Sequence, residues 1–402
     1  LRVLMSERPR WLGSFSNERL LAQVETALAA HQFYQLDREY VVHEGEVTIV
    51  DESTGRMMEG RKWQRGLHQA VEVKEGITVT ELTRHAAQIT IQSFFRHYKY
   101  LAGMTGTAMP ARRELQTAYR LDVSRIPTNR PCLRQECPSA VFATHMERNQ
   151  ALVESVVELV RHKRAVLIGT PSVSASEELG AMLEQARVQH VILNARHEAA
   201  EAAIVEKAGQ PGRVTIATNM AGRGVDIKLG GELTDEVIHK AHQTLQGRGL
   251  DPFAATLAQM GSAIAEVAPQ YAQRRDQVLD AGGLHVLGTE RHEARRIDNQ
   301  LRGRSGRQGE AGSSRFYLSL EDDLMRRFGR KEMLSRLMEQ IGDDFPIEHS
   351  LVSKTIERAQ TSVEGYNFDI RKHLLEYDDV LNLQRETIYD ERLRILKTDD
   401  LR

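Results

Sequence analysis

The sequence contains few cysteines, few aromatic residues and no long apolar run. Its two cysteines, Cys132 and Cys137, have no second Cys or His pair nearby, which argues against a disulfide framework and against a zinc site. No stretch approaches the ~18 apolar residues that a membrane-spanning helix needs, and the amino terminus lacks the charged-then-apolar pattern of a secretory signal. These absences predict reduced thiols and a cytoplasmic location.

Neither sign of charge is in excess. The chain has 54 Lys and Arg residues against 56 Asp and Glu residues, a formal net charge of -2. A protein whose whole surface binds nucleic acid is usually strongly basic, so this balance argues against such a protein. The hydrophobic content of 41% over 402 residues is enough to bury the cores of about two or three domains.

Short apolar runs alternate with helical patterns in the middle of the chain. The expected strands are residues 165–169, 190–193, 213–217, 284–288 and 315–318, and the expected helices are residues 146–162, 173–187 and 198–208. This alternation predicts an α/β fold with a parallel, doubly wound sheet. A polar, mostly helical insertion at residues 232–281 interrupts it.

Helical patterns also flank this region. Residues 18–35 predict an amphipathic helix, residues 40–43 and 46–50 predict a β-hairpin, and residues 79–100 predict a second helix. Residues 347–396 contain no proline and one glycine, which predicts a helical rod of roughly 70 Å. A scaffold is the preferred interpretation of this rod, and a dimerisation stalk is the alternative.

The first candidate site follows the strand at residues 213–217. Gly222 and Gly224 would let the backbone approach a ligand closely, and Arg223 between them could contact a phosphate. Asp226 could accept hydrogen bonds from sugar hydroxyls. A nucleotide at a domain cleft needs these features, although an ordinary strand-to-helix turn would also fit this motif alone.

The second candidate site is QLRGRSGRQG at residues 300–309, which begins with Gln300. Arg304 and Arg307 are three residues apart, so we expect both guanidinium groups on one side of a helical turn, where they could reach one phosphate. An arginine in this role stabilises charge on a γ-phosphate during phosphoryl transfer. A solvated basic surface or an RNA-phosphate patch is the alternative for this motif alone, whereas the two motifs together favour an ATP-driven motor.

The sequence lacks the two motifs that hold ATP in such motors. No Gly-Lys dipeptide followed by Ser or Thr occurs, although a phosphate loop requires one. The nearest match to a Mg²⁺-binding strand is VTIVDE at residues 47–52, which we interpret as a strand and turn because no phosphate loop precedes it. The chain would therefore supply one wall of an ATP cleft, either as a truncated motor, which the start at Leu1 favours, or as a degenerate paralogue.

Longer segments resemble SecA, the family of bacterial preprotein-translocase ATPases. The segments with this resemblance are residues 50–76, 101–108, 166–170, 215–231, 282–309, 311–325 and 363–385. The resemblance covers nearly everything from about residue 20 onward. It implies a RecA-like parallel-sheet domain, a flanking α/β remnant of a substrate clamp and a long helical scaffold.

The resemblance also implies four parts of the chain. They are the end of a preprotein-crosslinking domain at residues 1–78, the tail of a first nucleotide-binding domain at 79–125, a second RecA-like nucleotide-binding domain of the helicase C-terminal type at 126–320, and a helical scaffold and wing at 321–402.

The family's site residues can be carried over by position. The implied catalytic residues are Arg223, Arg304 and Arg307, and the implied ATP-binding residues are Gly222, Gly224, Asp226 and Gln300. Thr105, Gly106 and Thr107 match the motif that links ATP hydrolysis to movement between two RecA-like halves. No metal ligand is expected in this chain, because Mg²⁺ would be held mainly by the first half.

The cofactor implied by the resemblance is ATP with Mg²⁺. The implied partners are an unfolded preprotein and a SecYEG-type translocation channel, without nucleic acid, and a homodimer is one possible assembly. The implied place is the cytoplasm, peripheral on the inner face of the plasma membrane. The intact protein would be a protein-secreting ATPase, whereas this chain alone is predicted to be inactive. The alternatives are the C-terminal half of a DEAD-like nucleic-acid helicase and a non-catalytic SecA-like binding module.

Overall fold

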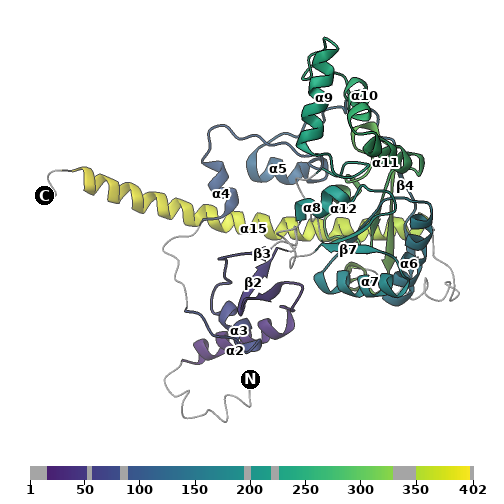
Figure 1. Ribbon diagram of the computed structural model, residues 1–402. Coiled ribbons are helices and arrows are strands. Elements are labelled where there is room, and N and C mark those ends of the chain that lie inside the picture. The colour runs from purple at the N-terminus through teal and green to yellow at the C-terminus, as the bar shows by residue number, and fades with distance from the viewer. Residues whose placement is uncertain are drawn as a thin grey trace. The chain divides into compact units, whose positions relative to one another are not determined.

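A computed structural model describes most of the chain (Figure 1). The described residues are 16–51, 57–81, 89–193, 201–218, 226–328 and 350–398. The chain divides into two compact units. The first comprises Leu1–Arg84, Asn149–Thr289 and Ala311–Ser313, and the second comprises His85–Arg148, Glu290–Glu310 and Ser314–Arg402.

The first unit begins with a small module of two helices and an antiparallel sheet. Its elements are α2 (Asn17–Gln32), β1 (Tyr40–His43), β2 (Glu46–Val50), β3 (Met57–Met58) and α3 (Leu67–Lys74). The predicted hairpin is confirmed, with Glu44 and Gly45 at positive φ in its turn. Buried Tyr40, Val47 and Val71 form the core of this module with Ala30 of α2.

A parallel sheet forms the larger part of the first unit. Its strands β6 (Val166–Thr170), β7 (His190–Leu193), β8 (Val214–Thr218) and β9 (Leu284–Gly288) follow the order β9-β6-β8-β7. All three pairings are parallel, and every residue of β8 and β9 is buried. Parallel strands need helices on both faces, which explains their continuous apolar sequence. The predicted strands are confirmed.

Helices connect these strands. They are α6 (His145–Arg161), most of which belongs to this unit, α7 (Val173–Gln185) and α8 (Glu201–Lys207). Helix α7 begins at the Ser172 cap and packs against β6, β7 and β8. The insertion consists of α9 (Asp235–Gly247), α10 (Leu257–Val267) and α11 (Pro269–Asp280), as its helical pattern predicted.

The second unit combines short strands with the long carboxyl-terminal helix. Its strands are β4 (Arg134–Glu136), β5 (Ala140–Phe142) and β10 (Gly312–Ser319), which belongs to this unit from Ser314 onward. Its helical elements are α4 (Ile91–Arg96), the 3-10 turn η2 (Met109–Ala111), α5 (Arg112–Tyr119), α12 (Arg295–Arg302), the 3-10 turn η4 (Arg307–Gly309), α13 (Asp323–Phe328) and α15 (Ser350–Lys397). Strand β5 pairs in parallel with β10, and the rings of Phe142 and Tyr317 stack at 6.1 Å between centroids.

The long helix α15 spans 48 residues and is the long yellow helix in Figure 1. The predicted rod is therefore confirmed. Polar contacts tie it to the amino-terminal helices of its own unit. Asp378 accepts hydrogen bonds from the backbone N and the hydroxyl of Thr90 at 3.2 and 2.6 Å, and Arg371 donates to Glu114 at 2.6 and 2.9 Å.

The helix predicted over residues 79–100 is wrong in its extent. Residues 77–81 are not helical, residues 82–88 lie outside the described residues, and helix α4 covers only Ile91–Arg96. Two contacts explain the difference. The Thr90 side chain caps α4 by accepting a hydrogen bond from Ser93 N, and the backbone of Thr80 is bound to a carboxylate instead of continuing a helix.

Candidate functional site

A buried aspartate lies in the first turn of α12. Asp298 is 1% exposed and accepts hydrogen bonds from Arg291 at 3.2 Å, from the backbone N and the ring of His292 at 3.0 and 2.8 Å, and from Gln360 at 2.8 Å. Burial alone would raise the pKa of Asp298, but the hydrogen bond from His292 and the charge of Arg291 outweigh it and keep that pKa below its usual value. The carboxylate is therefore ionised, and both of its oxygens accept hydrogen bonds.

Helix α15 holds the start of α12 through a second contact. Glu364 accepts hydrogen bonds from the backbone N of Arg295 at 2.7 Å and from its Nε and Nη2 at 2.9 and 2.6 Å. Gln360, one turn earlier on α15, also donates to the backbone oxygen of His292 at 2.8 Å. Charge-assisted, forked contacts of this kind fix orientation as well as distance. The position of α12 is thus set by α15.

The other end of α12 brings two predicted motifs together. Gln300 Nε2 donates to Thr107 Oγ1 at 3.1 Å. Thr107 in turn interacts with Thr105, whose Oγ1 lies 3.2 Å from Thr107 Oγ1 and accepts a hydrogen bond from the Thr107 backbone N at 3.3 Å. The exposed Gly106 lies between these threonines. Gln300 Oε1 is buried and finds no hydrogen-bond partner within the described part of the chain.

The arginines after α12 do not lie on one helical turn, so that prediction is wrong. Helix α12 ends at Arg302, and Gly306 follows at φ 68° before the short turn η4 begins with Arg307. A Cβ on Gly306 would lie 2.6 Å from that of Arg134, so glycine is needed there for space as well as for φ. The break separates Arg304, which is 8% exposed, from Arg307, which is half-buried and donates from Nε to the backbone oxygen of Gly303 at 3.2 Å.

The first predicted motif is described only at its end. Gly222, Arg223 and Gly224 lie outside the described residues. Asp226 is exposed and belongs to the first unit, where it precedes the buried Ile227.

Sequence reasoning missed two features around α12. The first is the set of contacts made by Asp298, whose only signal was an acidic residue among arginines after a buried strand. The second is the pair of guanidinium groups on Phe316, with the Cζ atoms of Arg291 and Arg302 at 4.1 and 4.8 Å from the ring centroid. Burial and the charge of Arg291 lower the pKa of Arg302. Arg302 therefore packs α12 against β10, and Arg291 packs the segment before α12 on the same ring.

The described residues contain neither a metal-binding cluster nor a membrane-spanning helix. No group of three or more His, Cys, Asp or Glu side chains in these ranges could hold a metal ion. None of the described helices is both long enough and apolar enough to cross a membrane.

The parallel sheet with its connecting helices defines an α/β protein with a RecA-like P-loop domain. Three family models match the chain and cover most of it. They are the SecA P-loop domain over residues 131–344, the SecA Wing and Scaffold domain over 346–402 and the SecA preprotein cross-linking domain over 8–72. The chain belongs to the SecA family.

Curated relatives agree with this assignment. The chain is 52% identical over 384 residues to the protein translocase subunit SecA of Chloroflexus aggregans, with 94% of this chain and 38% of that protein covered. It is 50% identical to the subunit of Roseiflexus sp. over 96% of this chain and 38% of the relative, and 49% identical to that of Geobacter metallireducens over 95% and 42%. The chain therefore spans about two fifths of the length of these relatives.

Proposed function

We propose that this chain is part of an ATP-driven motor that moves unfolded preproteins through a membrane channel, and that it supplies the second half of the ATP cleft. The observation that carries this proposal is the hydrogen bond from Gln300 to Thr107. This hydrogen bond joins the motif at residues 300–309, which is suited to sensing a nucleotide, to the Thr105–Thr107 motif, which is suited to transmitting a conformational change. The names of the relatives, protein translocase subunit SecA, support the same role.

The proposal keeps the site residues that the resemblance implies. The catalytic residues are Arg223, Arg304 and Arg307, and the ATP-binding residues are Gly222, Gly224, Asp226 and Gln300. Arg307 is the better candidate for a phosphate-contacting arginine finger, because it is more accessible than the buried Arg304. The buried Oε1 of Gln300, which has no partner among the described residues, could accept a hydrogen bond from a water or ligand.

A conformational change at Gln300 would be transmitted to two parts of the chain, the segment around Thr107 and helix α15. A displacement of Gln300 acts on Thr107 and, through Thr105, on the segment that joins α4 to α5. It also acts on α12 as a unit, and the contact between Arg295 and Glu364 passes it to α15. A helix of 48 residues carries a small rotation at one end over a long distance. Thr105, Gly106 and Thr107 are thus the coupling residues of the proposal.

The remaining assignments follow from the same role. The cofactor is ATP, with Mg²⁺ held mainly by the first half of the cleft. The partners are an unfolded preprotein and a SecYEG-type channel, with peripheral attachment to the inner face of the plasma membrane, and a homodimer is the assembly to examine. The near-balanced charge gives no support to the nucleic-acid helicase alternative.

A chimera tests the proposal directly. The matching 384 residues of the Chloroflexus aggregans relative would be replaced by this chain. We expect preprotein-stimulated ATPase activity in the chimera and at least a hundredfold loss, on the order of the effect of removing one charge-stabilising donor, with Arg307→Ala. Equal ATPase activity in the chimera with and without Arg307 would contradict the proposed arginine role. A chimera that hydrolyses ATP but moves no preprotein would contradict the translocation role.

A further inference from the structure

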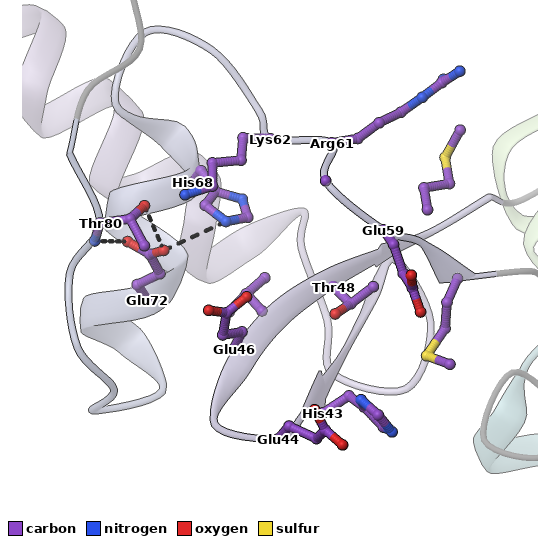
Figure 2. A pocket seen from close by; sticks show the side chains of 14 residues that line it. His43, Glu44, Glu46, Thr48, Glu59, Arg61, Lys62, His68, Glu72 and Thr80 are labelled. Carbon is purple, nitrogen blue, oxygen red and sulfur yellow. Dashed lines mark hydrogen bonds and ion pairs between the residues drawn. The ribbon is translucent and has the colours of Figure 1, made fainter.

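A polar cavity of about 460 Å³ lies in the amino-terminal module of the first unit. Figure 2 shows Glu46 and Thr48 of β2 on one side of it and His68 with Glu72 of α3 on the other. A cavity of this size is large enough for a ligand group with its neighbouring atoms. None of the residues assigned to the ATP cleft lines it.

His68 and Glu72 of α3 form a buried polar pair at the cavity. His68 and Glu72 are each 2% exposed, and His68 Nε2 lies 3.4 Å from Glu72 Oε1. The Glu72 carboxylate also accepts hydrogen bonds from the backbone N and the hydroxyl of Thr80, both at 2.8 Å. Burial lowers the pKa of His68, so its ring is neutral near pH 7 and the nitrogen that faces Glu72 carries the proton.

The second ring nitrogen of His68 is therefore left as an acceptor. His68 Nδ1 is buried and has no hydrogen-bond partner among the described residues. A buried polar atom without a partner costs free energy, and a ligand that donates a hydrogen bond removes that cost.

The walls of the cavity favour a cation. Four glutamates line it, against one arginine and one lysine, so carboxylates outnumber the permanently positive side chains. The Glu46 and Glu59 carboxylates are exposed and form no hydrogen bond or ion pair with the described residues. The Arg61 side chain points away from His68 and Glu46 in Figure 2. Met58 adds apolar surface that suits an aliphatic stem.

We propose that this cavity binds the side chain of a lysine or arginine in an extended polypeptide. The cationic head would donate to Glu46, Glu59 and His68 Nδ1, and the aliphatic stem would pack on Met58. This inference rests on the proposed function, because that function supplies an unfolded polypeptide. The cavity would give the proposed motor a preference for basic side chains in the polypeptides that it moves.

The test uses the whole chain and a pair of unstructured peptides. One peptide carries a single arginine, and the other carries neutral citrulline in its place. We expect the arginine peptide to bind about tenfold more tightly in fluorescence anisotropy, because two carboxylates and a buried acceptor each add a modest contribution. The double variant Glu46→Gln, Glu59→Gln should reduce this preference to less than about twofold.

A matched control removes the same charge elsewhere in the module. Glu18 and Glu25 are exposed on α2 and do not line the cavity. The double variant Glu18→Gln, Glu25→Gln should keep the tenfold preference. In addition, the ¹⁵N signal of His68 Nδ1 should shift when the arginine peptide binds and stay in place with the citrulline peptide.

The outcomes separate this inference from the proposed function. Equal affinity for the two peptides, or a preference that survives in Glu46→Gln, Glu59→Gln, overturns the cavity proposal and leaves polypeptide binding intact. No binding of either peptide contradicts both. If spermidine alone shifts the His68 signal as strongly as the arginine peptide does, the cavity is a site for small cations and the polypeptide proposal is wrong.

Discussion

Glu364, on the long helix α15, accepts three hydrogen bonds from Arg295, the first residue of α12. One of them comes from a backbone N–H at the start of α12, where a helix has no internal partner for such a group. A single carboxylate thus caps one helix and fixes it to another. The contact therefore links α15 to α12, the helix that carries Gln300.

We expect Glu364→Ala to destabilise the chain by about 1 kcal/mol, because the contact is forked and charge-assisted but partly exposed. Urea unfolding would measure the change as a lower midpoint at an unchanged slope. Glu386→Ala is the matched control, since Glu386 is an exposed glutamate on the same helix. Equal midpoints for the two variants would show that the Arg295 contact contributes nothing to stability.

Gln300 and Thr107 should show a measurable coupling free energy. In a double-mutant cycle with Gln300→Ala and Thr107→Val, we expect an interaction of about 1 kcal/mol, the contribution of one neutral hydrogen bond. Thr117→Val provides the control, because the Thr117 hydroxyl donates within its own helix to Arg113. Gln300→Ala and Thr117→Val should be additive, and additivity in the Thr107 cycle would contradict the contact.

Asp298→Asn should be costly, because the amide presents N–H groups to donors that need an acceptor. We expect a loss of about 3 kcal/mol in the free energy of unfolding at pH 7, in the range for breaking a buried ion pair on one side. Gln360→Ala removes one donor and leaves the carboxylate paired, so its loss should be smaller. A loss no larger in Asp298→Asn than in Gln360→Ala would show that the charge of Asp298 is unimportant.

The same aspartate predicts an acid-dependent loss of stability. The folded chain lowers the pKa of Asp298, so the unfolded chain takes up this proton first as the pH falls. The stabilisation is complete above the unfolded pKa of about 3.9 and is lost as the pH falls through the folded value. Unfolding measured between about pH 3 and pH 6 should therefore show a smaller acid loss in Asp298→Asn than in the wild-type chain.

Much of the fold could be predicted from the sequence, because local patterns determine it. Strands β6 and β9 are apolar runs between helical patterns, and α15 lacks residues that stop a helix. The expected helix over residues 79–100 was wrong, since apolar spacing does not reveal that Glu72 binds Thr80.

The residues of the candidate site remain predictions, and one part of their expected geometry was wrong. Spacing placed Arg304 and Arg307 on one turn, but Gly306 at positive φ separates them. The contacts of Asp298 were not predictable, because its partners include Gln360, which is 62 residues away in the sequence. Long-range polar contacts leave no periodic signal that a single sequence could show.

His68 should make the stability of the chain depend on pH. Burial lowers the pKa of His68 and exceeds the opposing effect of Glu72 and Glu46, while Lys62 acts in the same direction as burial. The unfolded chain therefore binds a proton at His68 before the folded chain does, and stability falls as the pH drops below about 6.5. Urea unfolding between about pH 5 and pH 7.5 should show this fall in the wild-type chain and a weaker one in His68→Gln. His31→Gln, at an exposed histidine of α2, should behave as the wild-type chain, and a His68→Gln profile parallel to that of the wild type would show that His68 is not held neutral by the fold.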